Sequence, residues 1–176
     1  MNQRRLILYI STSLDGYIAK PGDDLSFLER VHQEGEDYGY QEFVDSVDTV
    51  IMGRRTYDWV MRQVDEFPHA DKETYIVTRD PKPGQGKVNF YTGDVKELVK
   101  SLKQKIGKNI FCDGGAGVVD TLLKERLIDE MIISVVPVLV GNGIRLFREG
   151  QPEQDLELVE LKQFKTGLVQ MHYRKV

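Results

Sequence analysis

The sequence contains few of the residues that build metal sites, disulfide frameworks or nucleophilic centres. Cys112 is the only cysteine among 176 residues, which excludes an internal disulfide and any metal site made of several cysteines. A single cysteine fits a reducing compartment, and its place in the apolar run 109–112 predicts a buried structural thiol rather than a nucleophile. The three histidines, His32, His69 and His172, lie far apart without a metal-ligand spacing, so no metal is expected.

Long apolar runs and an excess of positive charge are also missing. The chain has no stretch of about 18 apolar residues, and the apolar run after Arg5 is too brief for the core of a signal peptide. We therefore expect a cytoplasmic protein that does not engage a membrane. Because the formal net charge is −4, a general polyanion-binding surface is not expected either, and nucleic acid is excluded as a partner on this basis.

The apolar residues that are present predict an α/β fold in one domain that spans residues 1–176. Two segments, 95–106 and 118–127, carry apolar residues at the three-and-four spacing of an amphipathic helix, and Asp94 with Glu97 resembles a capping pair before the first. Strands alternating with helices indicate a largely parallel sheet that is covered on both faces. The predicted strands are 6–10, 49–52, 74–77, 88–91, 109–112 and 131–136.

The C-terminal segments differ in pattern from the rest of the chain. Residues 156–165 and 168–176 show partial alternation around Lys165-Thr166-Gly167, which predicts an antiparallel hairpin added to the sheet. The expected result is a mixed, mostly parallel sheet of about eight strands. The polar segment 34–42 has no clear period and is either a flap over the substrate or a surface loop.

The most informative feature is the junction Asp113-Gly114-Gly115-Ala116-Gly117 between an apolar strand and an amphipathic helix. Glycines allow backbone N–H groups to approach an anion, and the start of a helix adds unpaired donors, so the junction can hold a phosphate. A tight turn without a ligand is the alternative. In open α/β sheets ligands bind beyond the carboxyl ends of the strands, where the loops 11–16, 53–56 and 78–80 would lie beside this junction.

Taken together, these segments resemble the dihydrofolate reductase-like superfamily, in particular the branch built like the reductase domain of bifunctional riboflavin biosynthesis proteins. The resemblance implies a three-layer α/β/α fold with an eight-stranded mixed sheet, and an NADPH-dependent reductase that pairs as a homodimer. The matching segments, in the family's order, are SLDGYIA at 13–19, MGRRTY at 52–57, VTR at 77–79, DGGAG at 113–117 and LIDEMIISVVPVLVGNGIRLF at 127–147.

The resemblance also implies roles for single residues around NADPH. The turn after the second strand would hold the pyrophosphate and the adenosine-side phosphate, with Arg55 at the variable position of its motif. Thr78 and Arg79 match the pair that receives the 2′-phosphate, which implies a preference for NADPH over NADH. The residues implied for the phosphates and pyrophosphate are Gly53, Arg54, Arg55 and Thr56, together with Gly114, Gly115, Ala116 and Gly117.

At the nicotinamide end, the resemblance implies contacts with Ser11, Ile18 and Ala19. For Ile18 and Ala19, ordinary core packing is the alternative. Hydride transfer to a C=N or C=O bond also requires a proton for the heteroatom. Asp15 is the candidate donor by matched position, and a turn role before Gly16 is the alternative. The loop 141–143 resembles one that borders the substrate cleft, although Asn-Gly is also a turn signal.

Two departures from the family restrict the function. No His-x-Glu followed by Pro-Cys-x-x-Cys occurs, so zinc-dependent deamination is excluded and a reductase alone is expected. The Pro-Trp step of true dihydrofolate reductases is absent after Ala19, which argues against folate. The sequence therefore predicts reduction of a small heterocyclic substrate, pterin-like or pyrimidine-like. The alternative is an NADP(H)-binding protein without turnover, used in sensing or assembly.

Overall fold

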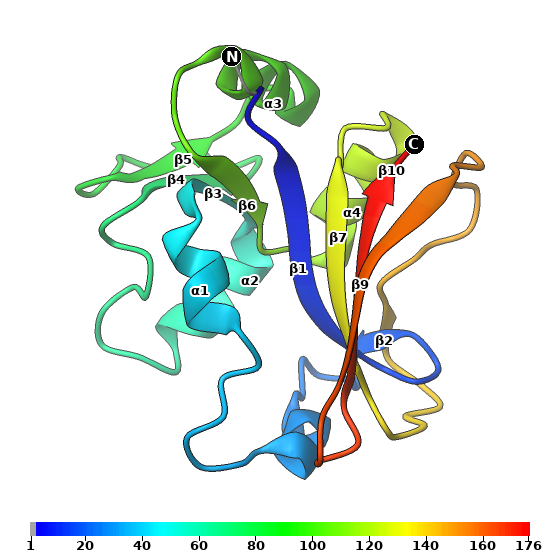
Figure 1. Ribbon diagram of the computed structural model, residues 1–176. Helices are drawn as coiled ribbons and strands as arrows, with labels where there is room; N and C mark the ends of the chain where they lie inside the picture. Colours follow the sequence, from blue (N-terminus) through cyan, green and yellow to red (C-terminus); the bar gives the residue numbers. More distant parts are fainter. Residues whose placement is uncertain (1–2) are drawn as a thin grey trace.

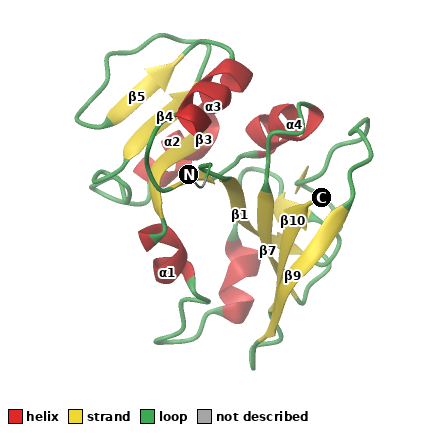
Figure 2. Cartoon of the chain, turned by 45° about the horizontal axis from the view of Figure 1, so that its top comes forward, coloured by secondary structure: helices red, strands yellow, loops and turns green. Residues whose placement is uncertain are grey.

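The computed structural model describes residues 3–176 and shows an eight-stranded mixed sheet with helices on both faces, seen in Figures 1 and 2. The strand order is β5-β4-β3-β6-β1-β7-β10-β9, and all pairings from β5 to β7 are parallel. The expected three-layer architecture is confirmed. The strands are β1 Leu6–Ser13, β3 Val47–Gly53, β4 Glu73–Val77, β5 Val88–Tyr91, β6 Asn109–Cys112, β7 Glu130–Val136, β9 Leu156–Gln163 and β10 Val169–Lys175.

The last two strands form the antiparallel hairpin that the sequence predicts. β10 pairs with β7 on one side and with β9 on the other, so β9 is an edge of the sheet. A second, small sheet was not expected from the sequence. It pairs β2 (Tyr17–Ala19) with β8 (Ile144–Arg145), two strands too short to show an alternating pattern.

The helices divide between the two faces of the sheet. Apolar residues of α1 (Tyr40–Asp45) and α2 (Arg54–Met61) pack with Val50, Met52 and Phe111 on one face. Those of α3 (Val95–Gln104) and α4 (Ala116–Lys124) pack on the other, where Cys112 is buried as predicted. The sequence did not predict α1 or the 3₁₀ helix Ser26–Val31, because each is only six residues long. Segment 34–42 therefore consists of turns followed by the start of α1.

α3 ends earlier than its apolar pattern predicts. Asp94 caps its start by accepting a hydrogen bond from the Lys96 N–H at 2.8 Å. At its other end the Leu102 carbonyl accepts from the Lys105 N–H at 3.2 Å and from the Arg4 guanidinium at 3.3 Å. The α-helical ladder therefore stops, and Ile106 lies outside the helix, 97% exposed. The expectation that Ile106 belongs to the buried face of this helix is wrong.

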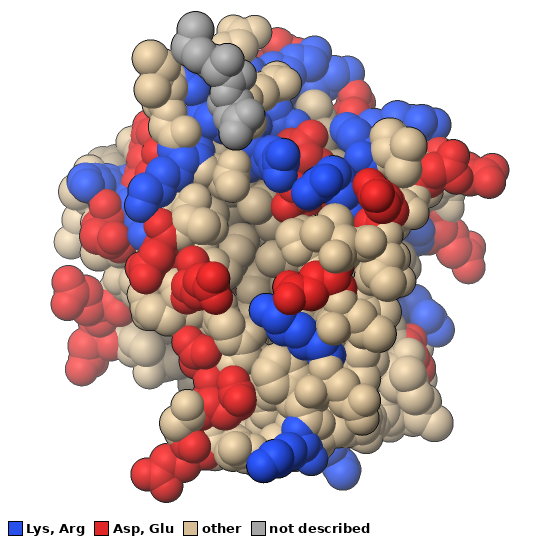
Figure 3. Space-filling view, in the orientation of Figure 1, with Lys and Arg blue, Asp and Glu red and all other residues tan. Residues whose placement is uncertain are grey.

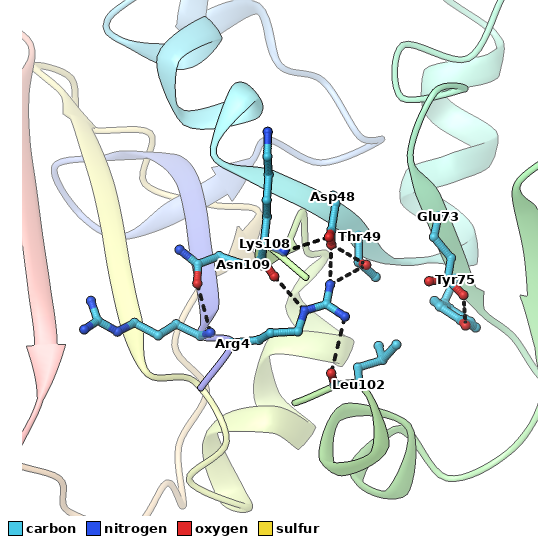
Figure 4. A network of polar contacts seen from close by, with 9 residues as sticks. Arg4, Asp48, Thr49, Glu73, Tyr75, Leu102, Lys108 and Asn109 are labelled. Carbon is cyan, nitrogen blue, oxygen red and sulfur yellow. Dashed lines mark hydrogen bonds and ion pairs between the residues drawn. The ribbon is translucent and has the colours of Figure 1, made fainter. Parts of the chain in front are cut away.

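A buried arginine joins several elements at the amino ends of the strands (Figure 4). Arg4, which is 5% exposed, pairs with Asp48 and donates to the Thr49 hydroxyl at 2.7 Å and to the Lys108 carbonyl at 2.6 Å. These contacts connect the start of β1 with the starts of β3 and β6. Because the three strands are parallel, the network fixes the relative positions of their carboxyl ends as well.

The face of the molecule seen in Figure 3 carries both positive and negative side chains. In Figure 3, acidic and basic side chains are interspersed over the upper part of this face, without a continuous basic patch in the view. Among residues 3–176, every helix is too short or too polar to cross a lipid bilayer.

Candidate functional site

Two adjoining cavities lie at the carboxyl ends of the parallel strands. The inner cavity has a volume of about 660 Å³ and the outer cavity about 650 Å³, and Asp23, Arg54 and Arg55 line both. The strands β1, β3, β4 and β6, whose ends were predicted to share one edge, are parallel, and their exit loops contribute to these cavities. The predicted phosphate-binding segments are thus brought together along one continuous surface.

The glycine junction and the turn after β3 contact each other directly. The Gly53 N–H donates to the Gly114 carbonyl oxygen at 2.8 Å, and the Gly114–Gly115 peptide is cis. A Cβ atom on Gly115 would lie 3.0 Å from the Thr56 hydroxyl oxygen, so a side chain at this position would crowd α2. Gly115, Ala116 and Gly117 line the inner cavity, and Gly114, which is buried, does not.

The first turns of α2 and α4 both face the inner cavity. Gly53 and Gly115 precede these helices, and neither offers a side chain to cap the free N–H groups. Arg54 and Arg55 occupy the first turn of α2, where a cation is unfavourable with respect to the helix dipole. Uncapped donors and adjacent cations form the environment that a bound phosphate group requires.

The outer cavity concentrates arginines around the ends of β3 and β4. Arg54 pairs with Asp58 at 2.7 Å and lies over the Phe90 ring, while Arg55 pairs with Asp23 at 2.7 Å. Thr78 and Arg79 line the same cavity, as the sequence predicts. Arg79 forms no ion pair within residues 3–176, so its charge is available to an anion.

Arg62 is a further cation of the outer cavity that the sequence analysis did not identify. It follows α2 as the C-cap residue and forms no ion pair within the part of the chain that the structure describes. Helical spacing could have identified it, because residues seven or eight positions after Arg54 and Arg55 lie on the same face of a helix.

The predicted nicotinamide segment forms one wall of the inner cavity. Ser11 belongs to β1, and Ile18 and Ala19 belong to the small sheet, where Ala19 pairs with Ile144. Gly143 approaches this pair so closely, at a φ of +141°, that a Cβ atom on it would overlap the Ala19 carbonyl oxygen. The loop 141–143 therefore supports the wall, and its neighbour Ile144 lines the cavity.

Asp15 lies outside both cavities and binds the loop that follows β7. Its carboxylate accepts hydrogen bonds from the Ser13 hydroxyl at 2.6 Å, the Val140 N–H at 3.0 Å and the Gly141 N–H at 2.7 Å. The Ser13 hydroxyl, followed by these N–H groups, lowers the pKa of Asp15 to about 2. Such a carboxylate is ionised at neutral pH and holds a loop in place, as expected of the turn role.

Asp113 and Asp23 are the two acidic residues that line the inner cavity, and Asp23 is paired with Arg55. Asp113 directly follows β6, the strand between β1 and β3, and its backbone N–H donates to the Ile51 carbonyl at 3.0 Å. Asp113 therefore lies at the carboxyl ends of these central strands. Burial raises the pKa of Asp113 to about 7, so that the carboxyl group exchanges its proton near neutral pH. The sequence showed the residue but not its burial.

Arg148 also lines the inner cavity and was missed by the sequence analysis. The segment that contains it runs alongside α4: Gln151 donates to Asp120 at 2.5 Å and Gln154 donates to the Leu123 carbonyl at 3.1 Å. Arg148, three residues before Gln151, lines the inner cavity together with Gly117 of α4. No sequence signal identified it, because the segment 146–155 has no regular pattern.

Comparisons with known proteins agree with this geometry. The profile of the RibD C-terminal domain matches residues 4–170, and the chain therefore belongs to this family. It is 43% identical to the uncharacterized protein YwjB from Bacillus subtilis over 172 residues, covering 97% of this chain and 98% of YwjB.

Solved structures show the same fold. A protein from Shewanella sp. PV-4, assigned provisionally to riboflavin biosynthesis, superimposes with a TM-score of 0.89 at 30% identity and covers 98% of this chain and 99% of its own. The bifunctional diaminohydroxyphosphoribosylaminopyrimidine deaminase and 5-amino-6-(5-phosphoribosylamino)uracil reductase from Thermotoga maritima has a TM-score of 0.72 at 13% identity, over 99% of this chain and 57% of its own. The expected superfamily, branch and fold class are confirmed.

Proposed function

We propose that this protein is a reductase that uses NADPH to reduce a C=N or C=O bond of a small pyrimidine-like or pterin-like substrate. The observation that carries the proposal is the convergence of the glycine junction, the α2 turn and the Thr78–Arg79 pair on two cavities that share Arg54 and Arg55. Membership of the RibD C-terminal family supports it.

The residues present fit a dinucleotide with three phosphate groups. Uncapped N–H groups at the starts of α2 and α4, with Arg54, Arg55 and Arg148, would hold the pyrophosphate. Arg62, Thr78 and Arg79 would hold the 2′-phosphate in the outer cavity. When bound, NADPH would supply the hydride, and the wall formed by Ser11, Ile18 and Ala19 would orient the nicotinamide.

Asp113 is the residue that we propose as the proton donor. It lies in the inner cavity, and its pKa near 7 allows it to deliver a proton at neutral pH and to take one up again from solvent. Asp15, whose oxygens accept three hydrogen bonds outside the cavities, is assigned to the loop instead.

The Trp59 side chain provides a direct test, because it is the only tryptophan and lines the inner cavity. Titration with NADPH should change its fluorescence and raise the melting temperature. NADPH oxidation at 340 nm with pterins, pyrimidine ribosides and small aldehydes should then identify an acceptor. Binding without oxidation would support the alternative, a nucleotide-binding protein in sensing or assembly, and no binding at millimolar NADPH would contradict both.

We further propose a homodimer formed through the edge strand β9. Every residue of β9 is exposed, and its large apolar side chains include Leu158 at 50% and Leu161 at 59% exposure. An exposed apolar edge strand invites pairing, and a second copy of the same edge would cover it with self-complementary contacts.

A further inference from the structure

The inner cavity has an aromatic wall that suits a planar ligand. Tyr9 of β1, Tyr40 of α1 and Phe111 of β6 all line it, and the Tyr9 and Tyr40 rings meet edge to face at 5.5 Å. Phe43 stacks on Tyr9 at 4.5 Å and packs against Phe111 at 4.9 Å, which fixes the rings of the wall relative to one another. Rigid rings of this kind bind flat aromatic molecules.

The tyrosine hydroxyl groups of this wall are already used by the protein. The Tyr9 hydroxyl donates to the Tyr38 carbonyl at 3.2 Å and accepts from the Gln170 amide at 3.1 Å. The Tyr40 hydroxyl pairs with His69 Nε2 at 3.3 Å. The wall therefore offers ring surface to a ligand rather than free hydroxyl groups.

Asp113 supplies the polar group at this wall. Because side chains alternate along a strand, Asp113 points to the same face of the sheet as Phe111. The pKa of Tyr40 is raised first by burial and then by the charge of Asp113, which indicates that Asp113 lies near the Tyr40 ring. Its carboxylate has no side-chain hydrogen-bond partner within residues 3–176. Asp113 is partly buried and lines the cavity, so N–H donors of a ligand can bind its oxygens there.

Three arginines also line the inner cavity: Arg54, Arg55 and Arg148. Arg54 and Arg55 also line the outer cavity, where they pair with Asp58 and Asp23. Each of these positions belongs to the phosphates of the proposed cofactor. The rings of the aromatic wall carry no positive charge, and neither do Leu25, Leu28 and Asp113, which line the same cavity.

We propose that the acceptor is an uncharged, unphosphorylated aromatic heterocycle that lies on the Tyr9–Tyr40–Phe111 wall and presents N–H donors to Asp113. Once Arg54, Arg55 and Arg148 are assigned to the phosphates of the cofactor, a phosphorylated acceptor would place a dianion beside the Asp113 carboxyl group without a further cation to pair with it, which is unfavourable by repulsion and by desolvation. This inference rests on the proposed function, because it assigns the arginines to the cofactor.

The test is equilibrium binding to the protein saturated with NADP⁺, followed by Trp59 fluorescence and by calorimetry, so that no turnover is needed. Two matched pairs of probes separate the two parts of the proposal. Cytidine and its 5′-monophosphate differ in the phosphate, and pterin and 1,3-dimethyllumazine differ in the N–H donors. We expect the first member of each pair to bind about tenfold more tightly. For the pterin pair this factor corresponds to one charge-assisted hydrogen bond, and for the cytidine pair it reflects the repulsion and desolvation of the phosphate.

Asp113→Asn should remove the preference for pterin over dimethyllumazine and reduce the preference for cytidine over its monophosphate. Glu42→Gln is the control, because Glu42 is an exposed acid on α1 that lines neither cavity, and it should leave both preferences unchanged. Tighter or equal binding of the monophosphate or of dimethyllumazine by the wild-type protein would overturn the proposal, as would binding of none of the four probes. Failure of NADP⁺ itself to bind would instead overturn the proposed function, so the two failures are distinguishable.

Discussion

Gly53 donates its backbone N–H to the carbonyl oxygen of Gly114 at 2.8 Å, which joins the exits of β3 and β6 into one surface. The two residues are separated by about a third of the chain, and each precedes or begins a turn that leads into a helix facing the inner cavity. Because both helices start without a side-chain cap, this hydrogen bond brings two sets of free N–H donors to the same ligand.

The first prediction concerns cofactor preference. Replacing Arg79 with alanine should weaken NADPH binding by about tenfold or more, since a charge-assisted contact to the 2′-phosphate is lost, and should leave NADH binding nearly unchanged. Fluorescence titration of Trp59 with each cofactor measures the effect. Arg62→Ala should act in the same direction, whereas Arg30→Ala, on the exposed surface of the 3₁₀ helix, is the control. Equal losses for both cofactors would contradict the assignment of Arg79.

The second prediction concerns the close approach of Gly143 to Ala19. Alanine at position 143 would overlap the Ala19 carbonyl oxygen, so the small sheet must shift, at a cost of about 1–3 kcal/mol typical of overpacking. We expect a lower melting temperature together with weaker NADPH binding, because Ala19 lines the cavity.

Gly141→Ala is the matched control in the same loop. Its φ is +78° and a Cβ atom there would have no neighbour within 4 Å, so only backbone strain of about 1 kcal/mol is added. If both variants lost NADPH affinity equally, the close contact at Gly143 would not explain the loss.

The third prediction is a pH dependence that Asp113 controls. The folded protein retains the Asp113 proton up to about pH 7, whereas the unfolded chain releases it near the ordinary pKa of 3.8. Stability from this group is therefore fully present below about pH 4 and is lost as the pH rises through 7. At about 1.4 kcal/mol per pKa unit, the shift from 3.8 to about 7 corresponds to a loss at pH 8 on the order of 4 kcal/mol.

Asp113→Asn, which cannot ionise, should accordingly be more stable than the wild type at pH 8 and similar to it at pH 4. Urea unfolding at the two pH values measures the difference. The same variant should lose the fall in turnover above pH 7 that a proton donor produces, together with most of its activity. A stability difference that does not vary with pH would show that Asp113 ionises normally.

The fourth prediction concerns the edge strand β9. Leu158→Glu combined with Leu161→Glu should convert the dimer to a monomer, because charges on both copies would face each other across the paired edge. Light scattering after size exclusion gives the mass. Ile106→Glu changes a residue that is 97% exposed after α3, and it should leave the dimer intact. A monomeric wild-type protein would contradict the proposal.

Local patterns predicted much of this molecule. The eight strands of the main sheet, both long helices and the C-terminal hairpin follow from periodicity, since burial of one face requires a regular spacing of apolar residues. The segments that line the two cavities follow from glycine, hydroxyl and arginine residues at strand exits. Errors occurred where the pattern is shorter than two turns, as in α1, or where a distant residue intervenes, as Arg4 does at the end of α3.

By itself, the sequence determined the order of strands and helices and the residues at each strand exit, because both depend on neighbours along the chain. Only the tertiary structure decided which acid faces the cavity. Asp15 and Asp113 each begin an Asp-Gly turn after a strand, yet one is bound by N–H groups from a loop 125 residues away and the other lines a cavity that aromatic rings also line. Their pKa values differ because solvation and hydrogen bonding are set by packing between distant segments.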